Sequence, residues 1–402
     1  MRTIYRTASP ILVLAMFMMS LAACGGASGG TQTLVIGTTL PLTGPLGPAG
    51  PLIQTAYMKA VNDINASGGL DVGGTKYKIQ LVVLDNQSDP NRASQQARTL
   101  LLQDNAVALL GAATPPLDIP ISSIGEQLKR PVVQSLTPLQ AWLSGRQGGW
   151  NYAWDLHFDE KQMTNLQFQT SDLVKTNKRV ALFTDTEEDG IVMGHLWEQK
   201  APQFGYQIVY HAQFPVGTTN FSSQIEAAKS AHADVLVAQM IPPDAVGLWK
   251  QMKSRGYQPK TAFCEKCGNG SWWRQTLGPV AEGTMAADWW SPSLGLPETN
   301  TFVSTYGKNA ITTDLSGIVA VNTAARVLFD AITQAHSLDP TAINTALGKI
   351  NKTYPLGHIQ FGANHAAPIM ALMDQWQGMN MVRVYPATQG AATVKAPVPG
   401  LG

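Results

Sequence analysis

The chain has 402 residues, of which 44% are hydrophobic and 14% are charged, and its formal net charge is +1. This length is sufficient for two hydrophobic cores of ordinary size, so two domains are expected. A charge this close to zero argues against the clustered Lys and Arg that displace counterions from nucleic acid, and no nucleic-acid partner is expected.

The first 24 residues have the layout of an export signal. Arg2 and Arg6 precede an apolar run, 11–19, which is too short to cross a bilayer and is followed by small residues. Residues 1–24 are therefore expected to form a signal peptide. Residues 25–32, which begin with GGASGG, are expected to form a flexible tether.

Residues 21–24, with the sequence LAAC, resemble the bacterial lipobox, in which the chain is cut before a cysteine that then carries lipid. The resemblance implies lipid attachment at Cys24 and an extracytoplasmic protein anchored to the cell membrane. Three acyl chains exceed the two signals that stable anchoring requires. The alternative is a secreted protein with a chance cysteine at its cleavage site.

Residues 34–64 predict a strand, a loop and a helix. Leu34–Ile36 are typical of a buried strand, residues 43–50 are rich in glycine and proline, and the apolar positions of 52–64 follow one helix face. Ligands of open α/β sheets bind outside the carboxyl ends of the strands, so we expect part of a binding site at Thr38–Pro51.

The alternation of strands and helices continues along the chain. Asp89 and Pro90 form a strong helix start, since the carboxylate can cap the helix and proline suits its first position. The pattern breaks at 144–160, which is rich in glycine and tryptophan, and then restarts. Further strands are predicted at 78–84, 106–110, 131–134, 180–183, 207–211, 234–240 and 261–263. The predicted fold class is α/β with two parallel sheets.

Enzyme motifs give no support for catalysis. The metalloprotease, P-loop and dinucleotide-binding patterns are missing, and the GxSxG match at 26–30 lies in the tether without a flanking strand and helix. We predict no catalytic residue and no cofactor. An enzyme with dispersed catalytic groups remains an alternative, because triads often lack a local motif.

Two groups of residues have the chemistry of metal ligands. Residues 155–160 include Asp155, His157, Asp159 and Glu160, for which we expect salt bridges and helix caps rather than a metal. Cys264 and Cys267 are spaced C-x-x-C, and a local disulfide is expected in an exported protein. A zinc site lacks a second ligand pair, and a redox site lacks a thioredoxin-like context, although a cell-surface redox protein is an alternative.

Seven segments, in order along the predicted mature chain, resemble the type I periplasmic binding proteins of the branched-chain amino-acid receptor family. They are 36–50, 81–101, 108–116, 179–190, 218–237, 318–335 and 359–368. The resemblance implies two Rossmann-like lobes with a ligand cleft between them, joined by three crossovers near 152–155, 284–289 and 357–361. The implied N-terminal lobe is 33–152 plus 290–358, and the implied C-terminal lobe is 153–289 plus 359–402.

The resemblance also implies a ligand site. Hydroxyl and backbone N–H groups of the first lobe would hold a carboxylate, with Thr114 at or next to one such position. Ser135 and Thr137 fall in a second loop, where Thr137 matches either a backbone contact or a threonine of the family. Ordinary helix capping is the alternative for all three.

In the second lobe, Glu265 falls where these receptors carry the glutamate that faces the ligand ammonium. The alternative is a solvated loop glutamate beside Lys266. Asp189 replaces a family tyrosine, and it either contacts a polar ligand group or caps the following helix. Aromatic residues are also missing at Ala49 and near Ile241, so leucine specificity is not implied. One or two tryptophans are expected to contact the ligand, from a set comprising Trp142, Trp150, Trp154, Trp272, Trp273, Trp289 and Trp290.

The predicted function is that of a solute-binding lipoprotein of an ABC importer. It would be a monomer that binds an amino acid or similar small molecule by hinge closure and delivers it to an ABC permease in the membrane. The alternatives are a sensory or adaptor module with the same fold, and a receptor for aromatic acids, amides or urea.

Overall fold

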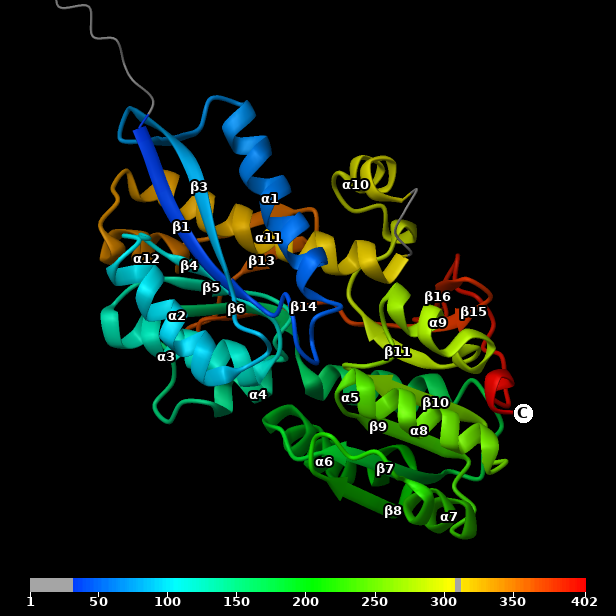
Figure 1. Cartoon of the computed structure of the whole chain (residues 1–402). Coiled ribbons are helices and arrows are strands. Elements are labelled where there is room, and N and C mark those ends of the chain that lie inside the picture. Colours follow the sequence, from blue (N-terminus) through cyan, green and yellow to red (C-terminus); the bar gives the residue numbers. More distant parts are fainter. Residues whose placement is uncertain (1–31, 308–311) are drawn as a thin grey trace, which may run out of the picture. The chain divides into compact units, whose positions relative to one another are not determined.

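The computed structural model describes residues 32–307 and 312–402. The predicted signal peptide, the lipid attachment at Cys24 and the predicted tether up to residue 31 lie outside the described residues. Within the described residues the chain forms two seven-stranded sheets and one two-stranded sheet. Helices accompany both large sheets, as expected for an α/β fold (Figure 1).

The first sheet has the strand order β14-β6-β5-β4-β1-β3-β2. All neighbouring strands in it are parallel except β2 and β3, which form an antiparallel pair. Its strands are β1 (Gln32–Leu40), β2 (Leu70–Val72), β3 (Thr75–Asp85), β4 (Leu109–Leu110), β5 (Val132–Gln134), β6 (Ala153–Phe158) and β14 (Ala366–Ile369). The central strands β4, β5 and β6 are buried along their whole length, as is usual where helices cover both faces of a parallel sheet.

We call this sheet, together with its helices and the two-stranded sheet, the first lobe. Its helices are α1 (Gly50–Ala66), α2 (Pro90–Leu102), α3 (Pro115–Leu128), α4 (Leu139–Ser144), α10 (Thr299–Tyr306), α11 (Thr312–Ala335) and α12 (Pro340–Leu347). The two-stranded sheet consists of β12 (Asn351–Tyr354) and β13 (Gly357–Gln360), and the short 3-10 helix η3 (Pro292–Leu294) precedes α10.

The start of α2 confirms a prediction from the sequence. Asp89 accepts a hydrogen bond from the backbone N–H of Arg92, and Pro90 is the first helical residue. Ala93, Ala97 and Leu100 are fully buried on the inner face of the helix. A proline at this position loses no helical hydrogen bond, because the first N–H groups of a helix have no partner within it.

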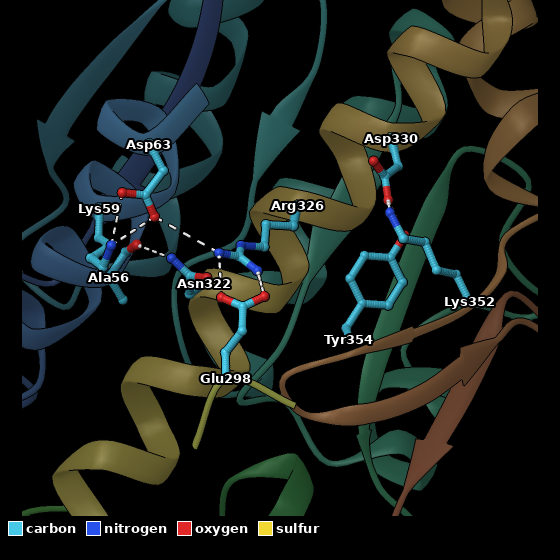
Figure 2. Close-up of polar contacts among 9 residues, drawn as sticks. All are labelled: Ala56, Lys59, Asp63, Glu298, Asn322, Arg326, Asp330, Lys352 and Tyr354. Carbon is cyan, nitrogen blue, oxygen red and sulfur yellow. Dashed lines mark hydrogen bonds and ion pairs between the residues drawn. The ribbon is translucent and has the colours of Figure 1, made fainter. Parts of the chain in front are cut away.

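Helix α11 is long and apolar enough to cross a membrane, but it is mostly buried within the described fold. It packs beside α1 although the two helices are far apart in the sequence (Figure 1). Figure 2 shows Arg326 of α11 between Asp63 of α1, at 3.8 Å, and Glu298, at 2.6 Å. Asn322 also donates a hydrogen bond of 3.2 Å to the backbone oxygen of Ala56 (Figure 2). These contacts join the segment before α11 to the N-terminal helix.

A second contact group joins α11 to β12. Asp330 accepts hydrogen bonds of 2.7 Å from Lys352 and from the hydroxyl of Tyr354 (Figure 2). Residues 298–307 and 312–354 therefore complete the first lobe, although a large part of the chain separates them from α1.

The second sheet has the order β16-β15-β11-β10-β9-β7-β8 and is mostly parallel. Its strands are β7 (Arg179–Asp185), β8 (Gln207–Phe214), β9 (Val235–Gln239), β10 (Thr261–Glu265), β11 (Met285–Asp288), β15 (Leu372–Gln377) and β16 (Asn380–Tyr385). Strands β15 and β16 are antiparallel additions from the C-terminal part of the chain, drawn in red in Figure 1.

This sheet and its helices form the second lobe. The helices are α5 (Glu160–Ser171), α6 (Glu188–Lys200), α7 (Ser222–Ser230), α8 (Pro242–Ser254) and α9 (Ser271–Leu277), with the 3-10 helices η1 (Ala201–Phe204), η2 (Gly278–Ala281) and η4 (Pro399–Leu401). The two mostly parallel sheets confirm the predicted fold class.

The chain passes between the two sheets three times. The first passage follows β6, the second follows β11, and the third separates β14 from β15. The pairing corrects the predicted lobe boundaries at two points, since residues 153–158 and 366–369 were assigned to the C-terminal lobe but belong to the first sheet. Pairing between β6 and β14 joins segments far apart in the chain, and no local pattern reveals such a register.

Candidate ligand-binding site

A cavity opens between the carboxyl ends of strands from both lobes. The space between these strand ends, with the solvent at its mouth included, measures about 650 Å³. Its lining comprises Ala113, Thr114, Pro115, Leu136, Pro138, His157, Phe158, Asp189, Gln239, Glu265, Lys266, Asn269, Ala287 and Trp289. The cavity therefore brings together three of the predicted ligand-binding residues, namely Thr114, Asp189 and Glu265.

On the first-lobe side, the backbone is held in an unusual conformation. Thr114 and Leu136 both have φ of +68°, and the N–H of Thr114 donates a hydrogen bond of 3.2 Å to the oxygen of Leu136. Such angles are costly for residues other than glycine, and residues of this kind cluster at binding sites. The two loops that follow β4 and β5 are thus joined at the cavity wall.

The hydroxyl of Thr114 is buried and has no hydrogen-bond partner in the described structure. Thr114 occupies the N-cap position of α3 but makes no side-chain capping bond, so capping does not explain the residue. Pro115 and Pro116 follow it and have no N–H group to offer a ligand. Thr114 therefore presents a hydroxyl that is available for hydrogen bonding on this wall.

The other two predicted residues of this loop region are not part of the lining. Thr137 donates its hydroxyl hydrogen to Asp118, which also accepts a hydrogen bond of 2.6 Å from the backbone N–H of Ala112. Thr137 thereby supports the turn that leads to Thr114. The hydroxyl of Ser135 is buried without a partner among the described residues.

On the second-lobe side, Glu265 ends β10 and is only 3% exposed. Its Oε1 accepts a hydrogen bond of 2.7 Å from Gln167, and its Oε2 accepts one of 2.9 Å from the N–H of Ala287. Burial raises the pKa of Glu265 to about 7, and these two hydrogen bonds oppose the shift only in part. The alternative of a solvated loop glutamate is therefore wrong.

Lys266 also lines the cavity, and its charge is balanced within the protein. Its Nζ lies 3.2 Å from Asp189 and 3.9 Å from Asp185, and it also contacts Glu187. Burial lowers the pKa of Lys266, but the three carboxylates raise it more, so that its pKa lies above its usual value. The three carboxylates approach one another closely enough to surround a cation, and the ammonium group of Lys266 fills that role.

Asp189 lies in the first turn of α6, where it faces the cavity. Besides its ion pair with Lys266, it accepts a hydrogen bond of 2.7 Å from Nε2 of Gln239. Asp189 therefore connects two other lining residues. The N-cap residue of α6 is Glu187, so Asp189 does not cap the helix, although a negative charge in the first turn favours the helix electrostatically.

Aromatic rings form part of the wall. His157 lies 4.6 Å from Trp289 between ring centres, and Phe158 lies 6.0 Å from Trp289. Burial lowers the pKa of His157 to about 3, so its ring is neutral at physiological pH. Trp289 alone among the seven tryptophans considered lines this cavity. Others pack elsewhere, as in the stacked pair of Trp142 and Trp150.

The acidic group near the first passage between lobes has structural roles. Asp159 accepts a hydrogen bond of 2.8 Å from the N–H of Lys161 at the start of α5. Glu160 accepts hydrogen bonds from the N–H groups of Gln140 and Ala141 at the start of α4. Caps are thus confirmed for Asp159 and Glu160 but not for Asp155, whose carboxylate oxygens have no hydrogen-bond partner among the described residues. The predicted salt bridges are not found for this group in the part of the chain that the structure describes.

Cys264 and Cys267 are joined by a disulfide and are fully buried. The four-residue ring contains Glu265 and Lys266, both of which line the cavity. The covalent link therefore restrains the segment that presents these two charges.

Several lining residues were missed from the sequence. Gln239, Lys266, His157 and Phe158 all lie at or next to the carboxyl ends of strands. For Gln239 a signal exists, since it is a polar residue that closes the apolar strand 235–239 at the edge where ligands bind.

Comparison with known proteins agrees with this architecture. A family model described as periplasmic binding protein matches residues 33–385. The Leu/Ile/Val-binding protein homolog 7 of Brucella abortus (strain 2308) is 25% identical over 407 residues, covering 94% of this chain and 98% of the relative.

Two solved structures with the same fold are informative. A branched-chain amino acid transporter substrate-binding protein of Streptococcus pneumoniae, in complex with isoleucine, has a TM-score of 0.74 at 20% identity and covers 88% of this chain and 100% of its own. An ABC transporter solute-binding protein of R. palustris, in complex with benzoate, has a TM-score of 0.74 at 16% identity, with 90% and 97% covered. The chain belongs to the periplasmic binding protein family, whose members bind solutes and are not enzymes.

Proposed function

We propose that the protein is an extracytoplasmic solute-binding lipoprotein of an ABC importer, and that it binds an amino acid or a related small polar solute between its lobes. The family match supports solute binding, and the relative from Brucella abortus is named for leucine, isoleucine and valine. Closure of the lobes around the ligand would present it to an ABC permease.

One observation carries this proposal: Thr114 and Glu265 come from different lobes and line the same cavity. Thr114 offers a hydroxyl that has no partner among the described residues, and Glu265 offers a buried carboxylate that is held only by neutral donors. An ionised carboxylate is costly to bury without a cation. The ammonium group of an amino acid would supply that cation, while its carboxylate could accept the hydrogen bond from Thr114.

The charges of the lining argue against an aromatic acid, such as the benzoate held by the R. palustris protein. Two lining residues, Asp189 and Glu265, are acidic. The lining cation, Lys266, already interacts with three carboxylates. A second anion near these groups would be repelled and would find no unpaired cation in the lining.

The lipid anchor rests on the LAAC segment and on its position after the apolar run. If Cys24 carries lipid, the wild-type protein should fractionate with membranes and incorporate labelled palmitate. The Cys24→Ala variant should do neither. Equal membrane association of the two proteins would reject the anchor.

The ligand class is tested by a thermal-shift screen of the purified chain without its first 24 residues. The probes are leucine, valine, phenylalanine, 4-aminobutyrate, benzamide, urea and benzoate. A ligand that binds only the folded state stabilises it by about 2.7 kcal/mol at a concentration 100 times its Kd. We expect an increase in melting temperature with at least one probe that carries an amino group. No shift with any probe would count against the proposed function.

A further inference from the structure

Gln239 is a buried residue whose side-chain amide makes a hydrogen bond through its nitrogen but not through its oxygen. It closes β9, is 2% exposed and lines the cavity. Its Nε2 donates a hydrogen bond of 2.7 Å to Asp189, while its Oε1 has no partner in the described structure. Because a buried amide oxygen without a hydrogen bond is costly, a ligand donor is the natural partner for this atom.

The orientation of this amide is fixed by charge. Asp189 is ion-paired with Lys266 at 3.2 Å, and a carboxylate can only accept hydrogen bonds. Turning the amide over would place its oxygen against the carboxylate of Asp189 and forfeit the 2.7 Å hydrogen bond. The sequence of contacts from Lys266 through Asp189 to Gln239 therefore keeps an acceptor available at the cavity.

Gln239 and Glu265 are direct neighbours in the second sheet. They are register partners at the ends of the parallel strands β9 and β10. Side chains at such positions project to the same face, about 4.8 Å apart along the hydrogen-bonding direction. Glu265 uses one acceptor position on each oxygen and retains further lone pairs. Two adjacent strand ends thus present two acceptors to one cavity.

We propose that Gln239 and Glu265 together recognise two N–H groups on a single nitrogen of the ligand, as in a primary ammonium or a primary carboxamide. Gln239 is then a specificity-determining residue that excludes ligands whose nitrogen carries only one N–H group. This inference rests on the proposed function, because it concerns the same cavity.

The two residues contribute differently to recognition. A carboxylate attracts any nearby cation, whether or not that cation carries N–H groups. A neutral amide oxygen instead requires a donor. Two N-methyl groups on an ammonium, or one on a carboxamide, leave a single N–H group on the ligand nitrogen, which cannot serve both acceptors, so the buried oxygen stays unpaired. Sites built to hydrogen-bond a ligand group reject analogues that lack it much more strongly than apolar pockets do.

The experiment is isothermal titration calorimetry with two matched ligand pairs, L-leucine with N,N-dimethyl-L-leucine and benzamide with N-methylbenzamide, so that each methylated ligand keeps one N–H group. Each pair is titrated into the wild type, Gln239→Met and Gln134→Met. Methionine has a similar length but no strong acceptor. Gln134 is the matched control because it also closes a buried strand and has one amide atom without a partner, but it does not line the cavity.

For the wild type and Gln134→Met, N-methylation should weaken binding by about tenfold or more, the scale of one hydrogen bond to a charged or buried group. For Gln239→Met the loss should shrink to about threefold or less, because the acceptor is already gone. The melting temperature of each ligand-free variant shows whether it is folded.

If ligands bind but N-methylation weakens wild type and Gln239→Met equally, the role of Gln239 is refuted while the proposed function stands. If benzoate binds and neither N–H ligand does, the cavity recognises an acceptor. The role of Gln239 and the proposed amino-acid class of ligand are then both refuted, and only solute binding stands. If none of these probes binds to the wild type, and the thermal-shift screen is also negative, both proposals fail.

Discussion

Gln167 donates a hydrogen bond of 2.7 Å from Nε2 to Oε1 of Glu265. The other end of the same amide accepts a hydrogen bond from the indole N–H of Trp197. Helices α5 and α6 therefore fix the carboxylate at the end of β10 through a single glutamine. A charged group that is already oriented loses little conformational freedom when a ligand binds, which favours affinity.

Glu265→Gln should weaken binding of an amine-bearing ligand by about 1.5 kcal/mol or more, the scale of a charged hydrogen bond. The substitution keeps the size of the side chain but removes its negative charge. Calorimetry gives the affinity, and the matched control is Glu282→Gln. Glu282 lies in the same lobe, pairs with Arg274 and Lys395, and does not line the cavity. Unchanged affinity in Glu265→Gln would reject the assignment of Glu265 as a ligand-binding residue.

Ligand affinity should depend on pH through Glu265. Burial raises the pKa of this residue from 4.5 to about 7. An ammonium ligand binds the ionised form, so affinity should be highest above about pH 7 and should fall by up to about tenfold for each further unit of acidity. Titrations across this range measure the effect, and Glu265→Gln should flatten the profile. A profile that is equally steep in the variant would assign the titration to another group.

Lys266→Met should destabilise the fold strongly. The substitution leaves Asp185, Glu187 and Asp189 without the cation that balances them, and breaking a buried ion pair from one side costs about 3–5 kcal/mol. Chemical denaturation measures the change. Lys59→Met is the control, since Lys59 pairs with Asp63 on a helix surface and such pairs contribute about 0.5 kcal/mol. Similar losses in the two variants would contradict the buried network.

Replacing both Cys264 and Cys267 by serine should lower the free energy of unfolding by about 2 kcal/mol, as expected for a four-residue ring. Ligand affinity should change little, because the hydrogen bonds that orient Glu265 come from Gln167 and Ala287 outside the ring. Denaturation and calorimetry on one preparation separate the two effects. A cell-surface redox function would instead require these thiols. Loss of ligand binding by calorimetry in a variant that denaturation shows to be folded would favour that alternative.

Much of the fold follows from local sequence patterns. The cap formed by Asp89 and the proline after it predicted the start of α2, because both effects act within one turn of helix. The alternation of strands and helices can also be read from the sequence alone, and it predicted mostly parallel sheets. The pairing of β6 with β14 was not predicted, since it depends on contacts between segments that share no local signal.

The site was predicted in part. Thr114 and Glu265 were found because hydroxyls and acids near strand ends match the pattern of a resembling family, and both line the cavity. No role was predicted for Lys266, because its carboxylate partners lie on β7 and α6, far away in the sequence. Gln239 was missed because the sequence does not reveal that its amide nitrogen is bound to Asp189. Without that partner, it cannot be inferred that the amide oxygen is left for a ligand.

The central claim is that one small solute contacts both lobes at once, and a crystal structure of the protein grown with a solute selected by the thermal screen tests it most directly. We predict a nitrogen of that solute about 3 Å from a carboxylate oxygen of Glu265, with its opposite end at the hydroxyl of Thr114. Electron density for the solute on any other surface, with the space between these two side chains filled by water alone, would contradict the account.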